Sequence, residues 1–130
     1  MSAIGSAKLQ LRKSMRQRLL QLSAEQLACS SQQIQAHVVA HQSFRRAQHV
    51  SIYLSMDTCE AQTFALAEHA LAAGKSLYVP RCRGPRMDMV RVADTAALAG
   101  LTRNAWGIAE PSDDDPAVDP KILDFVLVPG

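Results

Sequence analysis

Three basic side chains near the N-terminus have the spacing of a phosphate-binding row. Lys8, Arg12 and Arg16 recur every four residues, so on a helix they would lie along one face. Lys binds phosphate as a point charge and Arg as a planar fork. No acidic residue occurs before Glu25, which leaves this row without a local partner of opposite charge.

Three interpretations of this basic segment remain open. A solvated basic face needs no ligand at all. An Arg-rich segment without acids is also typical of a mitochondrial presequence. The third interpretation is a site for phosphate groups, with nucleic-acid binding as a variant. The net charge of only +2 and the low aromatic content of 5% argue against that variant.

Glu60 is a candidate site residue because of the strand that precedes it. In residues 50–55, Val50, Ile52 and Leu54 alternate with other side chains, which predicts a half-buried strand. Ligands in an open α/β sheet bind at the carboxyl ends of strands, and Glu60 lies shortly after such an end. A single glutamate there is by itself more typical of a solvated loop, so the position alone does not establish a function.

The composition excludes several classes of protein. The chain has 130 residues, of which 48% are hydrophobic, which suits one folded domain over residues 1–130 and is too apolar for a disordered chain. No run of about 18 apolar residues is present, so we expect no membrane span. The N-terminus lacks the apolar centre of a signal peptide. We expect a cytoplasmic protein, with the mitochondrion as the alternative.

The cysteines and histidines do not form a metal motif. Cys29, Cys59 and Cys82 are widely spaced and include no C-x-x-C pair, which predicts reduced thiols rather than a zinc site or a disulfide framework. His37 and His41 could share a helix face, but no H-E-x-x-H pattern surrounds them. Surface positions are therefore expected for both histidines.

Apolar residues at helical spacing predict three main helices. We expect them over residues 6–22, over 25–41 with Ser23 as N-cap, and from Thr63 to Gly74, where Gly74 ends the helix. The first helix has an apolar stripe made of Leu11, Met15, Leu19 and Leu22.

The strand pattern predicts the fold class. Strands are expected at residues 50–55, 76–80, 87–92 and 123–128, with Pro80 stopping the second. The order strand, helix, strand favours a parallel pair. The predicted fold is a three-layer α/β/α sandwich with a mainly parallel sheet, and the helices over 6–22 and 25–41 packed outside.

The segments between these elements complete the prediction. Residues 44–47 are expected to be a linker, and Asp94 to cap a short helical turn over 95–98. Arg81, Arg83 and Arg86 would follow the end of a strand. Trp106, the only tryptophan, lies in a predicted loop and is more typical of a core residue than of a ligand platform.

The charges are unevenly distributed along the chain. Residues 1–48 carry seven Lys or Arg and one acid, a net +6, whereas residues 110–130 carry six acids and one Lys, a net −5. Such asymmetry indicates either a polyanion-binding end or two solvated faces.

Several short motifs together resemble the 5-formyltetrahydrofolate cyclo-ligase (methenyltetrahydrofolate synthetase) family. Each motif is weak alone, but their order and spacing cover nearly the whole chain. They are K-x-x-x-R at Lys8 and Arg12, I-Y-L-S-M at 52–56, E-A-Q-T at 60–63, G-K-S-L-Y-V-P-R at 74–81, M-D-M-V-R at 87–91, W-G-I-A-E-P at 106–111, and D-F-V-L-V-P-G at 124–130.

The resemblance implies an ATP-dependent reaction on a folate. ATP and 5-formyltetrahydrofolate would give 5,10-methenyltetrahydrofolate, ADP and phosphate, with Mg²⁺ on the ATP phosphates. The partners would be these small molecules, without nucleic acid or membrane. By matching position, residues 8–12 (Lys8, Leu9, Gln10, Leu11 and Arg12) would contact ATP, and Leu54, Glu60 and Trp106 would contact the folate. Glu60 would also act in catalysis.

The chain differs from the family pattern at its end. Members of the family continue past V-P-G with a glycine-rich segment that contributes to the nucleotide, substrate and magnesium contacts, so we expect no metal ligand within 1–130. We expect a fragment of the enzyme, incomplete at the C-terminus, with little activity alone, and monomeric unless exposed apolar surface causes self-association. The alternative is a catalytically incompetent binding module that acts through its basic N-terminal helix.

Overall fold

A five-stranded sheet forms the centre of the protein, which is seen here in a computed structural model that describes residues 2–130. The strands are β1 (His49–Ile52), β2 (Ser76–Arg83), β3 (Arg86–Val92), β6 (Ala117–Val118) and β7 (Phe125–Leu127). They lie in the order β6-β3-β2-β1-β7. Strand β1 is parallel to β2 and β7, whereas β3 is antiparallel to β2 and β6. All of these strands except β3 therefore run the same way, which confirms the mainly parallel sheet.

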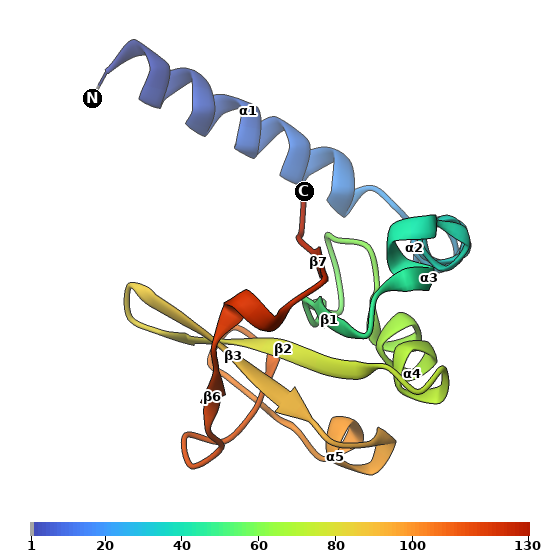
Figure 1. Cartoon of the computed structure of the whole chain (residues 1–130). Coiled ribbons are helices and arrows are strands. Elements are labelled where there is room, and N and C mark those ends of the chain that lie inside the picture. The colour runs from blue at the N-terminus through green and yellow to red at the C-terminus, as the bar shows by residue number, and fades with distance from the viewer. Residues whose placement is uncertain (1) are drawn as a thin grey trace.

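Helices α2 (Ala24–Ala40), α3 (Gln42–Arg46), α4 (Phe64–Ala72) and α5 (Thr95–Ala99) flank the sheet (Figure 1). The sequence signals for their ends are confirmed. Ser23 and Gln26 form a reciprocal capping box at the start of α2, which satisfies two backbone N–H groups. Asp94 accepts from the Ala97 N–H at 2.8 Å and caps α5. Gly74 follows α4 at a φ of +79°, a conformation that glycine adopts without steric cost.

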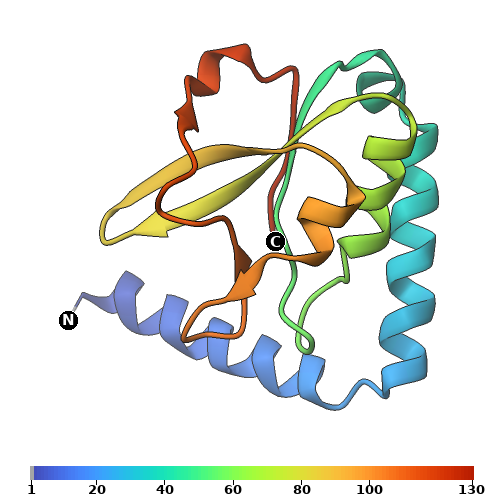
Figure 2. The same cartoon turned by 90° about the horizontal axis from the view of Figure 1, so that it is seen from below.

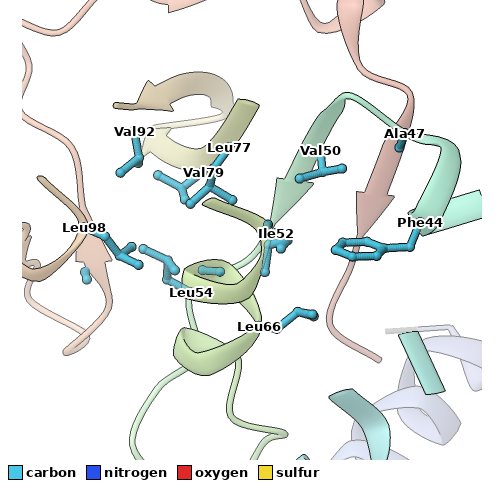
Figure 3. Packing of buried hydrophobic residues seen from close by; sticks show 13 residues of the cluster. Phe44, Ala47, Val50, Ile52, Leu54, Leu66, Leu77, Val79, Val92 and Leu98 are labelled. Carbon is cyan, nitrogen blue, oxygen red and sulfur yellow. The ribbon is translucent and has the colours of Figure 1, made fainter. Parts of the chain in front are cut away.

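The main hydrophobic core lies between the sheet and these helices. Figure 3 shows Val50 and Ile52 of β1, Leu77 and Val79 of β2, Leu66 of α4, and Phe44, all buried in one cluster. Phe44 belongs to the short helix α3, so the prediction of a linker there is wrong. Its ring packs edge-on against Phe125 of β7, with ring centroids 5.4 Å apart.

The opposite face of the sheet is crossed by the chain between β6 and β7. These strands are at opposite edges, so residues 119–124, including the 3-10 helix η1 (Pro120–Ile122), pass over the sheet (Figures 1 and 2). Asp124 anchors the crossing beside β1. Its Oδ2 accepts from the N–H groups of Gln48 and His49, each at 2.9 Å, and its own N–H donates to the His49 carbonyl at 2.8 Å.

Strand β2 is longer than the sequence predicted. It continues through Pro80 to Arg83 and turns at Gly84, where φ is +58°, into β3. Strand β1 ends at Ile52, so this part of β2 is a sheet edge, where a residue without an N–H is tolerated. The three arginines expected after the strand consequently lie in the β2–β3 hairpin, so that prediction is wrong.

Helix α1 (Ala3–Leu20) stands apart from the core (Figures 1 and 2). None of its residues is buried, and Leu11 of the predicted apolar stripe is 64% exposed. The expectation that this helix packs on the sheet is therefore wrong for the described chain, whereas α2 does pack beside α3 and α4. No helix among residues 2–130 is long and apolar enough to cross a membrane.

Two leucines should respond differently to truncation. Leu66 is 2% exposed and packed in the core, whereas Leu11 on α1 is 64% exposed. We expect Leu66→Ala to lower the free energy of unfolding by about 2–5 kcal/mol, because it leaves a cavity. Leu11→Ala should change it by about 0.5 kcal/mol or less. Urea denaturation measures both, and equal losses would place α1 in the core.

The carboxylate of Asp124 should make stability depend on acid pH. The N–H of His49, then that of Gln48, stabilises the charged form and lowers the pKa of Asp124 below its ordinary value. This contribution is present above the unfolded-state pKa of about 4 and is lost as the pH falls through the lower folded-state pKa. We expect Asp124→Asn to lower the melting temperature at pH 7, with the difference from wild type shrinking below about pH 4. A difference that is constant with pH would contradict this account.

Candidate functional site

A cavity of about 240 Å³ lies at the carboxyl ends of β1, β2 and β7. Ser51 and Val126 line it, and these residues alternate with Val50, Ile52 and Phe125, which face the main core. The cavity therefore lies against the face of the sheet that the core helices leave uncovered. This is the place where an α/β sheet commonly holds a ligand.

The cavity wall is mostly apolar and unusually rich in sulfur. Met56, Met87 and Met89 line it together with Cys82 and Pro80. The buried hydroxyl of Ser51 donates a hydrogen bond to the Sδ of Met89 at 3.3 Å, so this polar group already has a partner. Methionine side chains are flexible and polarisable, so this wall can adapt to the shape of a ligand.

A two-stranded ribbon forms a second side of the cavity. Strands β4 (Thr102–Arg103) and β5 (Ala109–Glu110) pair antiparallel, and Asn104, Ile108 and Glu110 face the cavity. Glu110 joins the ribbon to the sheet, because its Oε2 accepts from the Cys82 N–H at 2.9 Å. Arg103 joins it to the loop after β1 through an ion pair with Asp57 at 3.3 Å.

The loop after β1 places Glu60 at the cavity. The Oε2 of Glu60 accepts from the Met56 N–H at 2.6 Å, which closes a turn over residues 56–60. Cys59, inside this turn, has a φ of +68°, a strained conformation for a residue other than glycine. Since one carboxylate oxygen is used by the backbone, Oε1 is the oxygen left for a ligand.

The base of this loop is fixed by a reciprocal pair of hydrogen bonds. The Ser55 N–H donates to Thr63 Oγ1 and the Thr63 N–H donates to Ser55 Oγ, both at 3.1 Å. Thr63 Oγ1 also donates to the Tyr53 carbonyl at 2.6 Å. Both residues are buried, so these bonds are shielded from water and hold the two ends of the loop together.

Tyr53 lies beside Glu60 in the cavity wall. Its hydroxyl donates to the Ala61 carbonyl at 3.0 Å. Burial, and then the negative charge of Glu60, raise the pKa of Tyr53 above its ordinary value. The phenol therefore stays protonated at neutral pH and can act as a hydrogen-bond donor.

The structure brings some of the predicted site residues together and separates others. Glu60 and Leu54 both line the cavity, whereas Lys8 and Arg12 lie exposed on α1 and do not. Trp106 is 76% exposed near the tip of the β4–β5 ribbon, so the expectation of a core tryptophan is wrong. The Asn104 side chain sets this turn, because its Oδ1 accepts from the Trp106 N–H at 2.9 Å. Ligand contacts by Leu9, Gln10, Leu11 and Trp106 stay predictions.

The cavity also contains residues that the sequence did not indicate as site residues. Met87 and Met89 alternate along β3, and Glu110 ends the W-G-I-A-E-P motif just before its proline. The period-two alternation could have shown that both methionines share one face. No sequence signal indicates that β5 would bring Glu110 to the end of β2.

Two arginines of the β2–β3 hairpin contact the acidic part of the chain. Arg81 is buried and pairs with Asp88 at 3.2 Å, while its Nη1 donates to the carbonyls of Ser112 and Asp115. Arg83 pairs with Asp113. Of the six acids in residues 110–130, only Glu110 and Asp113 form ion pairs, both with Arg83. Within residues 2–130, by contrast, no carboxylate forms an ion pair with a Lys or Arg of α1.

No group of three or more His, Cys, Asp or Glu side chains in residues 2–130 could hold a metal ion. His37 and His41 are both exposed. His41 instead caps α3, since its Nδ1 accepts from the Ser43 N–H at 3.1 Å.

Comparison with known proteins decides the family. The model of the 5-formyltetrahydrofolate cyclo-ligase family matches residues 4–130. The chain belongs to this family. It is 33% identical over 132 residues to the mouse (Mus musculus) 5-formyltetrahydrofolate cyclo-ligase, and 30% identical over 135 residues to a probable 5-formyltetrahydrofolate cyclo-ligase of Caenorhabditis elegans. It also resembles the NMR structure of 5,10-methenyltetrahydrofolate synthetase from Aquifex aeolicus, with a TM-score of 0.78 and 26% identity.

The chain spans only part of these relatives. The matches cover 98% and 100% of the chain but 64% and 65% of the mouse and nematode proteins. The structural match covers 93% of the chain and 59% of the Aquifex protein.

Proposed function

We propose that this protein takes part in the ATP-dependent conversion of 5-formyltetrahydrofolate to 5,10-methenyltetrahydrofolate, with ADP and phosphate as the other products. The observation that carries the proposal is the position of Glu60 and Leu54 in one apolar cavity, in a chain that belongs to the cyclo-ligase family. A flat ring system with polar edges suits a cavity that is mostly apolar but has a few fixed polar groups.

The proposed chemistry proceeds by activation of an oxygen atom. The γ-phosphoryl group of ATP moves onto the formyl oxygen of the folate, which forms an O–P bond and breaks the bond between the β- and γ-phosphates. N10 of the folate then attacks the activated formyl carbon. Phosphate leaves with the former formyl oxygen, and N10 loses its proton as the ring closes.

In this scheme Glu60 binds the folate beside the reacting atoms. Its Oε2 is fixed by the Met56 N–H, so Oε1 can accept a hydrogen bond from the ligand or receive the N10 proton. Leu54 and the methionines Met56, Met87 and Met89 would contact the faces of the ring system. Trp106 is exposed on the neighbouring ribbon and would stack on the ligand only if that ribbon closes over it.

Lys8 and Arg12 are the proposed contacts for the ATP phosphates. One helical turn separates them on α1, and both are exposed, so both can reach one triphosphate. The described side chains provide no metal-binding cluster.

A second candidate function rests on the same helix. The Lys and Arg residues of α1 have no carboxylate partner in residues 2–130, and Leu11 and Met15 of its apolar stripe are exposed. A binding module that uses α1 alone would also fit these observations. The two functions differ in a simple assay, because the module would bind its partner without any turnover of 5-formyltetrahydrofolate.

The role of the Glu60 carboxylate is tested by Glu60→Gln, because this substitution keeps the size of the side chain and removes its charge. We expect turnover to fall by about 10²- to 10⁴-fold if Glu60 receives the N10 proton, with the circular dichroism spectrum unchanged. The assay follows methenyltetrahydrofolate formation by its absorbance. It uses the natural gene product, including any residues encoded beyond 1–130, with residues 1–130 alone assayed in parallel. Unchanged turnover in the variant would return Glu60 to the role of a loop residue.

The phosphate contact is tested by comparing two arginines of α1. Arg12→Ala should weaken ATP binding by about tenfold or more, because it removes a charge-assisted hydrogen bond. Arg18→Ala, six residues further along the same helix, removes the same charge but should have little effect. Calorimetric titration with ATP measures both. Equal effects would mean that α1 contributes only general positive charge.

A further inference from the structure

The turn that carries Glu60 is held from outside the cavity by a single amide side chain. The Nε2 of Gln62 donates to the Met56 carbonyl at 2.8 Å and to the Glu60 carbonyl at 2.9 Å. These carbonyls belong to the two ends of the 56–60 turn. Since a glutamine amide carries two N–H donors, the two bonds use its full donor capacity, and they fix which end of the amide faces the turn.

Gln62 is itself fixed by helix α2. Its backbone N–H donates to the Oγ of Ser31 at 2.8 Å, and Ser31 donates in turn to the Leu27 carbonyl at 2.7 Å. Ser31 is buried. The side-chain amide of Gln62 therefore projects from a backbone position that helix α2 holds in place.

The turn needs such support because its own backbone is strained. Cys59 has a φ of +68°, a left-handed conformation that a non-glycine residue adopts at a cost of about 1 kcal/mol or more. The other bond that closes the turn is made by the Glu60 carboxylate, with the Met56 N–H. Without Gln62, that carboxylate would have to hold the turn closed and bind a ligand at the same time.

We propose that Gln62 is a positioning residue that holds the 56–60 turn closed, so that the Glu60 carboxylate stays aimed into the cavity. Gln62 does not line the cavity, so it acts through Glu60 and not on the ligand. The catalytic consequence rests on the folate function proposed above, whereas the positioning of Glu60 does not.

Two substitutions remove the clamp at nearly constant size. Gln62→Met keeps an unbranched side chain and loses both donors, and Gln62→Glu replaces the donors with carboxylate oxygens that repel the two carbonyls. The matched control is Gln33→Leu, because Gln33 is exposed on α2. Thermal unfolding establishes that each variant folds.

The decisive readout needs no substrate. The charge of Glu60 contributes to the raised pKa of Tyr53, and the sequence has only two tyrosines. In a Tyr78→Phe background, the phenolate absorbance therefore titrates Tyr53 alone. Glu60→Gln should lower the Tyr53 pKa, because it removes the negative charge that disfavours the phenolate.

Gln62→Met and Gln62→Glu should shift the Tyr53 titration from its wild-type position, whereas Gln33→Leu should not. In Gln62→Met the pKa should fall toward the Glu60→Gln value, since the released carboxylate moves away into solvent. A Tyr53 titration that is unchanged in Gln62→Met but lowered in Glu60→Gln would overturn the proposal. So would a titration that Glu60→Gln leaves unchanged, or the failure of both Gln62 variants to fold.

The enzymatic readout separates the inference from the proposed function. In the natural gene product, Gln62→Met should lower kcat/KM for 5-formyltetrahydrofolate about tenfold and leave KM for ATP unchanged, because α1 is not part of the clamp. A rise in KM for ATP as large as that for 5-formyltetrahydrofolate would indicate a general structural role and overturn the proposal. If the wild type has no turnover but the Tyr53 titration behaves as expected, only the proposed function fails.

Discussion

The structure depends on the burial of one short strand at the centre of the sheet. Strand β1 has parallel partners on both sides, and Val50, Ser51 and Ile52 are almost completely inaccessible to solvent. Val50 and Ile52 fix the core helices on one face, and Ser51 faces the cavity on the other. Because β1 cannot shift its register without exposing this set, the loop that leaves its carboxyl end begins from a fixed position.

That fixed start explains how an irregular loop can hold a carboxylate in one orientation. The Ser55–Thr63 pair closes the base of the loop, and Ser31 and Arg103 bind it from α2 and from β4. The strain at Cys59 is located inside this frame. Strained backbone persists where the surrounding structure determines it, and a site that must present one carboxylate oxygen to a ligand is a suitable place for it.

Much of the fold could be predicted from the sequence, because its signals are local. The capping residues Ser23 and Asp94 and the glycine after α4 depend on neighbouring residues, and the structure contains all of them. The half-buried strand expected over 50–55 is wrong in extent and burial, because β1 ends at Ile52 and Ser51 is covered by the walls of the cavity. The errors concern long-range contacts. Pro80 predicts the end of β2 only while β1 is taken to extend alongside it, and the sequence does not show that β1 ends earlier. In the same way, the apolar stripe on α1 does not reveal what would cover it. For the site, Glu60 and Leu54 both line the cavity, and their ligand contacts stay predictions. The position of Glu110 could not be predicted, because it depends on the packing of the ribbon against β2.

The pairing of β1 with β7 also affects the order in which the chain can fold. The β2–β3 hairpin forms between neighbours in sequence, but Val50 must pair with Phe125, which the ribosome adds 75 residues later. Contacts between such distant residues form slowly, because closing the intervening loop costs entropy. During synthesis, the edge of β1 that pairs with β7 therefore has no partner strand until after the β2–β3 hairpin is complete. Asp124 directly precedes β7 and binds the start of β1, so its bonds fix the register of the last strand in the folded protein.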